Sequence, residues 1–215
     1  MAKTPEQLFT RRAAVTLALA LGATPAFAVP RRRVVTILGD SITAGLGLPA
    51  ADALPARLEA ALARAGVAAK VRGAGVSGDT TAAGLARVDF SVQSDTDVCV
   101  VALGGNDLLN GYDTAATRAN LDRIVRHLKA RRIGVVVAGL SAPTAIGAGY
   151  AHDFTAIFPA VARANRVPVY PDLLAGVGRD PRLNQRDGIH PNALGVQLIA
   201  ARLAPVVAAA LRTRR

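Results

Sequence analysis

The chain has 215 residues, of which 51% are hydrophobic and 19% charged, and this predicts one folded domain while excluding a disordered protein. Its formal net charge of +11 comes from basic residues scattered along the chain without a recognition motif, so a nucleic-acid-binding protein is not indicated. The single cysteine, Cys99, excludes an intramolecular disulfide framework and a multi-cysteine zinc site.

Residues 1–28 have the pattern of a secretory signal peptide. The positive region, the apolar run and the small-residue cleavage pattern are Lys3 with Arg11 and Arg12, residues 13–21, and Ala26-Phe27-Ala28. The apolar run is short for a membrane span, so a retained anchor is the less favoured alternative. We therefore predict a mature domain at 29–215, without a stable membrane span, that is periplasmic or secreted. The Arg11-Arg12 pair also admits a twin-arginine export route.

Apolar runs typical of buried strands alternate with amphipathic segments typical of helices along the mature chain. The predicted strands are 34–38, 70–74, 98–103, 133–140 and 167–170. The predicted helices are 54–65, 80–87, 114–131, 154–164 and 193–211. This alternation predicts a parallel sheet with helices on both faces, which is a three-layer α/β/α sandwich in one α/β domain.

Glycine-rich and polar segments follow the first three predicted strands, and one more precedes the last helix. These segments are Gly39-Asp40-Ser41, residues 75–79, residues 104–107 and residues 187–192. In open parallel sheets, binding sites lie outside the carboxyl ends of the strands, where the strand order reverses. We therefore expect these segments to meet at one site.

Ser41, Asp187 and His190 are the candidate reactive residues. Ser41 follows a glycine turn at the start of a helix, where the alternative interpretation is a helix N-cap. Asp187 lies three residues before His190, close enough to bind one ring nitrogen and leave the other as a base, although the pair also suits a turn. The Asn106 amide and the backbone N–H of Gly78 are candidates for stabilising negative charge, while an ordinary turn or N-cap is the alternative for Asn106.

Two other features offer competing interpretations. Residues 73–78 match the dinucleotide fingerprint G-x-G-x-x-G, which predicts a nucleotide-binding module of a different functional class. The match follows the second predicted strand rather than the first, and it leaves Ser41 and His190 without roles. His152 is a reserve candidate for the base, and its neighbour Asp153 is expected to cap the helix that follows.

Four blocks of the chain resemble, in order, those of the GDSL or SGNH hydrolases: LGDSITAG (38–45), GVSGDTTAAGLAR (75–87), LGGNDLLNG (103–111) and DGIHPN (187–192). The resemblance runs from about residue 34 to residue 201, and the chain looks most like the exported bacterial arylesterases, thioesterases and lysophospholipases. It implies a flavodoxin-like five-stranded sheet in the order 2-1-3-4-5. It also implies a serine esterase that hydrolyses small-molecule acyl esters or thioesters.

The resemblance further implies a role for each candidate residue. Ser41 is the implied nucleophile, Asp187 and His190 complete the triad, and the oxyanion hole is formed by the Ser41 N–H, the Gly78 N–H and the Asn106 amide. No metal or organic cofactor is implied. A carbohydrate O-acetylesterase of the same fold and a non-catalytic lipid-binding protein stay open as alternatives. The sequence leaves the oligomeric state open, with a monomer as the default expectation.

Overall fold

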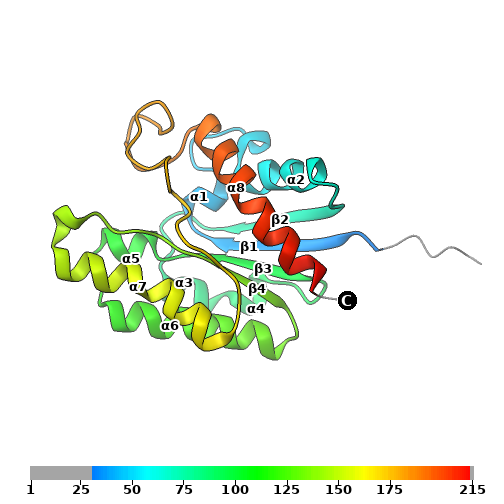
Figure 1. Cartoon of the computed structure of the whole chain (residues 1–215), viewed down its shortest axis with the longest axis horizontal. Helices are drawn as coiled ribbons and strands as arrows, with labels where there is room; N and C mark the ends of the chain where they lie inside the picture. The colour runs from blue at the N-terminus through cyan, green and yellow to red at the C-terminus, as the bar shows by residue number, and fades with distance from the viewer. Residues whose placement is uncertain (1–30, 214–215) are drawn as a thin grey trace, which may run out of the picture. The chain divides into compact units, whose positions relative to one another are not determined.

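The computed structural model describes residues 31–213, so the predicted signal peptide at 1–28 lies outside the described residues. Five parallel strands form one sheet in the order β2-β1-β3-β4-β5 (Figure 1). The strands are β1 (Arg33–Gly39), β2 (Ala69–Gly75), β3 (Val98–Ala102), β4 (Gly134–Ala138) and β5 (Val169–Tyr170). Both the predicted α/β class and the implied strand order are confirmed.

Helices cover both faces of this sheet (Figure 1). One face carries α2 (Leu54–Arg64) and α8 (Ala193–Arg212), which pack against each other. The other face carries α3 (Thr81–Ala86), α6 (Thr114–Ala130) and α7 (Ala148–Asn165). The short elements are α1 (Ser41–Ala44), η1 (Ala50–Asp52), α4 (Val88–Ser91), α5 (Gly105–Leu109) and η2 (Thr144–Ile146).

The core lies where the central strands meet these two helix layers. Every residue of β3 is buried, as the continuous apolar run predicts for a strand covered on both faces. Within that strand, Cys99 is fully buried, and burial raises the pKa of its thiol to about 12, so the side chain acts as a small apolar residue. Helix α8 is long and apolar enough to span a membrane, but its buried residues face the sheet and α2, as expected for a core helix.

Most predicted elements differ from the observed ones by a few residues at their ends, and β4 is shorter than the predicted 133–140; the bounds of α7 and β5 have a physical explanation. Helix α7 begins at Ala148 rather than at 154, so Asp153 lies inside the helix and does not cap it. Gly147 precedes the helix at a φ of 113°, and this turn made the segment look like a loop in the sequence. Strand β5 has only two residues, because Pro168 has no N–H to donate to the ladder.

The strand order places the ends of β1 and β3 at the point where the chain reverses direction across the sheet. From β1 the chain crosses to β2 at one edge, and it then returns past β1 to β3. Gly39, the last residue of β1, pairs with Gly75 of β2 on one side and with Ala102 of β3 on the other. The segments that follow these three residues therefore emerge together, as the sequence predicted.

Candidate active site

Ser41, His190 and Asp187 form one chain of hydrogen bonds. The Oγ of Ser41 lies 2.8 Å from Nε2 of His190, and Nδ1 of His190 lies 2.6 Å from Oδ2 of Asp187. Hydrogen bonds from the backbone and side chain of His190, and from the backbone of Ile189, lower the pKa of Asp187 to about 2. An ionised carboxylate only accepts hydrogen bonds, so the proton of the second bond belongs to Nδ1, and Nε2 is left to accept from the serine hydroxyl.

Helix α1 presents Ser41 at the end of β1. Asp40 is the N-cap of this helix, because its Oδ1 accepts from the N–H of Ile42 at 3.0 Å. The alternative in which Ser41 serves as the cap is therefore wrong, since a neighbour caps the helix and the hydroxyl of Ser41 points to the imidazole. A side chain at Gly39 would bring its Cβ within 2.1 Å of Thr43 Oγ1, so only glycine allows this tight turn into the helix.

The segment that carries Asp187 and His190 is fastened to the loop after α1. Gln185 donates from Nε2 to the carbonyl of Leu46 at 2.8 Å and to that of Pro191 at 3.1 Å, and its own N–H donates to the carbonyl of His190 at 2.8 Å. Gly188, at a φ of 69°, makes the turn between the carboxylate and the imidazole. The sequence does not indicate this role of Gln185, because its partner Leu46 lies 139 residues away in the chain.

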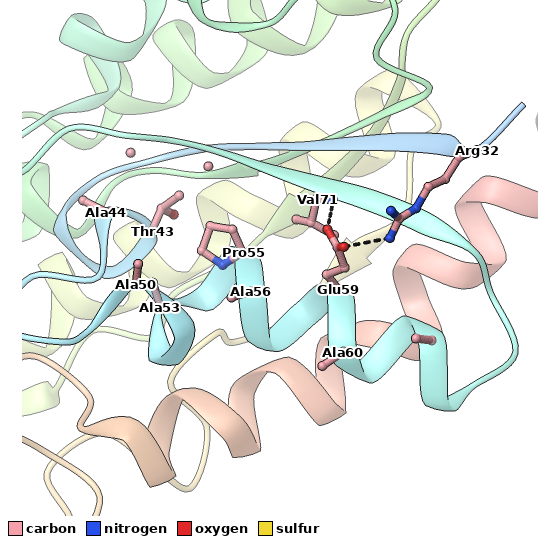
Figure 2. A pocket seen from close by; sticks show the side chains of 13 residues that line it. Arg32, Thr43, Ala44, Ala50, Ala53, Pro55, Ala56, Glu59, Ala60 and Val71 are labelled. Carbon is pink, nitrogen blue, oxygen red and sulfur yellow. Dashed lines mark hydrogen bonds and ion pairs between the residues drawn. The ribbon is translucent and has the colours of Figure 1, made fainter.

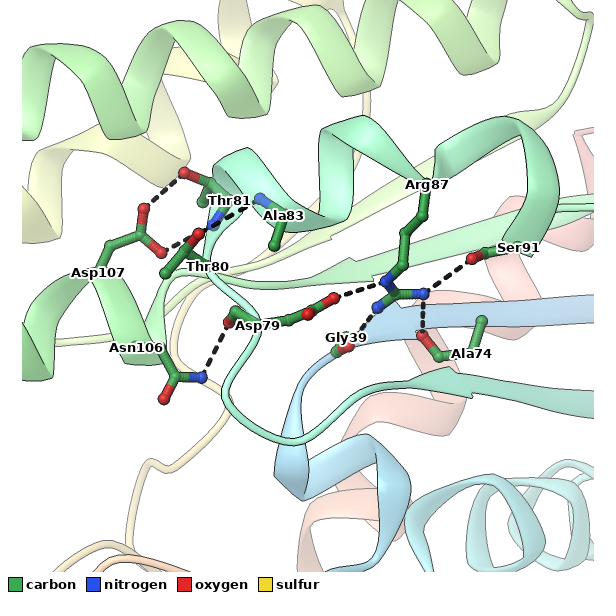
Figure 3. Close-up of polar contacts among 10 residues, drawn as sticks. All are labelled: Gly39, Ala74, Asp79, Thr80, Thr81, Ala83, Arg87, Ser91, Asn106 and Asp107. Atoms are coloured by element: carbon green, nitrogen blue, oxygen red, sulfur yellow. Dashed lines mark hydrogen bonds and ion pairs between the residues drawn. The ribbon is translucent and has the colours of Figure 1, made fainter.

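Asn106 contacts Asp79, the residue that directly follows Gly78. The Nδ2 of Asn106 donates to the carbonyl of Asp79 at 2.8 Å, which leaves its second amide hydrogen unused (Figure 3). Within residues 31–213, the N–H of Gly78 has no hydrogen-bond acceptor. Helix α5 lies against Asp40, whose Oδ2 is 3.2 Å from the Cβ position of a side chain at Gly105. Gly104, not Asn106, is the N-cap of α5, so the cap alternative for Asn106 is wrong.

The competing features lie elsewhere or have another explanation. His152 is an exposed residue of α7, and Ser41 contacts His190 instead. Gly73 and Gly75 belong to strand β2, and a Cβ at Gly75 would lie 2.4 Å from the backbone nitrogen of Ala44. Gly75 therefore allows α1 to lie close to β2, and Gly73 does the same for Pro55 of α2, 2.8 Å from its Cβ position, so packing accounts for these two glycines of the match.

A separate groove of about 770 Å³ lies along α2 and the edge strand β2 (Figure 2). Small side chains such as Ala56 and Ala60 line it, together with the ion pair of Arg32 and Glu59 at 2.7 Å. No triad residue lines this groove. The space beside Ser41 and His190 is instead too shallow to enclose a water molecule, and its walls include the apolar residues Ile42, Leu46, Leu48, Pro191 and Val196.

Comparison with known proteins identifies the family that shares this fold and these blocks. The model of the GDSL-like lipase/acylhydrolase family matches residues 37–198. The chain belongs to this family. It is therefore a hydrolase of the SGNH type, and the resemblance inferred from the four sequence blocks is confirmed.

Members of the family with names and structures are similar to most of the chain. Esterase TesA of Pseudomonas aeruginosa is 36% identical over 166 residues, which cover 77% of this chain and 82% of the relative. Thioesterase 1/protease 1/lysophospholipase L1 of Escherichia coli K12 is 36% identical over 157 residues, covering 73% and 74%. The structure of AlinE4, an SGNH-hydrolase family esterase, superimposes with a TM-score of 0.70 at 41% identity, covering 83% of this chain and 96% of that one.

The carboxyl group of Asp40 makes the stability of this family member depend on pH. Burial raises the pKa of Asp40 to about 6, which the N–H of Ile42 and the charge of His190 partly oppose. Because the pKa is higher in the folded chain than its ordinary value of 3.8, the folded state loses stability as pH rises through the interval from about 4 to 6.

We expect Asp40→Asn to remove this loss, because the amide oxygen still caps α1 and carries no charge. At pH 8 the variant should be more stable than the wild type by about 2–3 kcal/mol, the linkage free energy for a pKa moved from 3.8 to about 6. At pH 4 the two proteins should differ little. Urea unfolding at both pH values measures this, and equal differences at the two values would contradict a buried ionised Asp40.

Proposed function

We propose that the protein is an exported serine esterase that hydrolyses acyl ester or thioester bonds through an acyl-enzyme on Ser41. The observation that supports this most directly is the unbroken hydrogen-bonded chain from the hydroxyl of Ser41 through His190 to the carboxylate of Asp187. A serine so arranged is activated by the neighbouring base, which is held in one tautomer by the carboxylate. The export signal at 1–28 is part of the proposal.

In the first half of the reaction, Ser41 Oγ attacks the carbonyl carbon as its proton passes to Nε2 of His190. The tetrahedral intermediate collapses when the same proton is given to the departing alcohol or thiol, and the acyl group stays on the serine. Water then attacks the acyl-enzyme as His190 takes its proton, and His190 returns that proton to Ser41 Oγ when the bond to the acyl group breaks and the carboxylic acid leaves. The Asp187 carboxylate stabilises the imidazolium that forms in each half.

We assign the oxyanion hole to three donors that the chain leaves available. The N–H of Ser41 is at the first residue of α1, where no intrahelical acceptor exists. The N–H of Gly78 and the second amide hydrogen of Asn106 complete the set. Such donors contribute mainly after negative charge has developed on the substrate oxygen.

Asn106→Ala is accordingly expected to reduce kcat by roughly 10²–10³-fold with a much smaller change in KM, because the donor matters mostly in the transition state. Steady-state kinetics with a p-nitrophenyl ester measure both constants. Asn120→Ala is the matched control, since this amide lies on α6 and donates to Thr81 Oγ1 rather than to a residue assigned to the oxyanion hole. A rise in KM with unchanged kcat would make Asn106 a substrate-binding residue instead.

Exposed apolar side chains near these residues favour an apolar acyl or aryl substrate over an acetylated carbohydrate. All lie on segments that carry site residues or on the loop after β4, and each is about half exposed or more: Val76, Leu109, Tyr112, Ile146 and Ile189. A sugar would instead be matched by hydrogen-bonding side chains.

A series of p-nitrophenyl esters from acetyl to decanoyl, assayed with the domain 29–215, tests this proposal. We expect kcat/KM to rise by at least about 10-fold between acetyl and octanoyl, since each methylene removed from water contributes up to about 0.8 kcal/mol. Activity restricted to the acetyl ester would favour the O-acetylesterase alternative. Binding of fatty acid without turnover of any ester would favour the non-catalytic lipid-binding protein.

A further inference from the structure

Arg87, at the junction of α3 and α4, points its guanidinium toward the ends of two strands rather than into solvent (Figure 3). Its side chain is only 19% exposed. It donates from Nε to Asp79 Oδ2 at 2.5 Å, from Nη2 to the carbonyl of Gly39 at 2.8 Å, and from Nη1 to the carbonyl of Ala74 at 3.0 Å and Ser91 Oγ at 2.8 Å. One side chain thus joins β1, β2, the segment after β2, and α4.

The acceptors of this guanidinium adjoin the groups that we assign to the oxyanion hole. Gly39 lies two residues before Ser41, at the last position of β1. Asp79 directly follows Gly78, and its backbone carbonyl accepts the 2.8 Å hydrogen bond from Asn106 Nδ2. The ion pair therefore holds Asp79 in place. The carbonyl of Asp79 accepts from Asn106, and the residue before it, Gly78, carries another of the proposed donors.

We propose that Arg87 is a positioning residue of the oxyanion hole, which fixes the end of β1 and the segment 75–80 relative to each other so that their N–H donors meet one substrate oxygen. This inference rests on the proposed function. Arg87 itself touches no reacting atom, and it acts through Gly39 and Asp79. The remaining bonds of its guanidinium, from Nη1 to Ala74 and Ser91, help to hold the group in this orientation.

The geometry requires an arginine rather than a positive charge alone. The planar fork donates in several fixed directions at once, here to two carbonyls, a carboxylate and a hydroxyl, whereas a lysine ammonium is a point charge on a flexible stem. The carbonyls of Gly39 and Ala74 lie at strand ends, where backbone acceptors need partners outside the sheet ladder. Loss of the fork would release Asp79 and remove the Ala74 carbonyl's bond to Arg87, and it would leave the Gly39 carbonyl with the 3.2 Å hydrogen bond from the N–H of Val76.

The test is the effect of Arg87→Gln on kcat and KM for p-nitrophenyl hexanoate, measured alone and in combination with Asn106→Ala. We expect the single substitution to lower kcat by about 30-fold and to change KM by less than about threefold. Misplaced oxyanion donors reduce the stabilisation of the transition state more than the binding of the substrate. In the Asn106→Ala background, Arg87→Gln should lower kcat by less than about fivefold, since the two residues act on the same donors.

Arg72→Gln is the matched control. Arg72 lies on β2 and, like Arg87, forms an ion pair with an aspartate: its guanidinium donates to Asp95 at 2.5 and 2.6 Å, but it contacts no residue of the site. We expect its kcat to equal that of the wild type. Arg87→Lys provides a second variant if Arg87→Gln does not fold, and it should keep the unfolding temperature close to that of the wild type while kcat stays at least about 10-fold low.

Three results would overturn the inference. They are a wild-type kcat in Arg87→Lys, a double variant whose loss of kcat is the product of the losses in Arg87→Gln and Asn106→Ala, and a rise in KM of Arg87→Gln with unchanged kcat. Each of these presupposes an active wild type. An inactive wild type would instead overturn the proposed function, so the two failures are distinguishable.

Discussion

Ser41→Ala should lower kcat for ester hydrolysis by about 10⁶-fold, the scale of loss when a triad enzyme is deprived of its nucleophile. The fold should be unaffected, because Asp40 and not Ser41 caps α1, and the lost hydroxyl bonds only to His190. A fluorophosphonate should add its mass to the wild type and not to the variant, as measured on the intact protein. The two quantities that distinguish the variant from the wild type are kcat and the extent of labelling.

Ser94→Ala is the matched control for this substitution. Ser94 is exposed and precedes the amino end of β3, whereas Ser41 follows the carboxyl end of the parallel strand β1, so both turnover and labelling should match the wild type. Labelling that persists in Ser41→Ala, or residual activity above about one hundredth of the wild type, would place the nucleophile elsewhere.

Asp187→Asn should slow turnover by about 10⁴-fold, by analogy with the best-studied triads. The amide keeps the size of the carboxylate, but it cannot hold the proton on Nδ1 of His190 or stabilise the imidazolium. The low pKa of Asp187, about 2, keeps the wild-type carboxylate ionised throughout the range in which the enzyme is assayed. Comparison of kcat for the two proteins between pH 6 and 9 measures the effect.

Asp180→Asn distinguishes a triad role from the loss of any carboxylate in this region. The pKa of Asp180 is also lowered to about 2, by hydrogen bonds from the side chain and backbone of Arg182, but it makes no contact with the triad. We expect its kcat to be unchanged. Equal kcat in Asp187→Asn and Asp180→Asn would remove Asp187 from the mechanism.

The sheet was predictable because each strand is a local property of the sequence. The apolar runs at 34–38 and 98–103 are long and bounded by glycine or aspartate, and both proved to be strands of the buried sheet. Strand order is not local, and it came from the likeness of the four blocks to a known family. The start of α7 was missed because Gly147 and Gly149 hide a helix that tertiary contacts of its later turns stabilise.

The sequence predicted only those site residues that stand in recognisable motifs. Ser41, Asp187 and His190 stand in segments with recognisable spacing, and the structure brings the three together, while their catalytic roles stay predictions. Arg87 could not be distinguished from a solvated arginine at a helix end, since its acceptor at Gly39 lies 48 residues away. Asp40 was read as part of a turn, because burial, which raises its pKa, is a property of the folded chain.

The hydrogen bond from Ser41 to His190 spans 149 residues, and this separation sets the order in which activity is acquired during synthesis. A chain synthesised as far as β4 already contains Ser41, Gly78 and Asn106, but neither Asp187 nor His190. Asp187 and His190 are followed directly by α8, which packs on α2 and the sheet, and their loop is held against Leu46. If Ser41 and His190 have the proposed roles, we expect a nascent chain to hydrolyse no ester until the segment that carries His190 has been made and has reached Ser41.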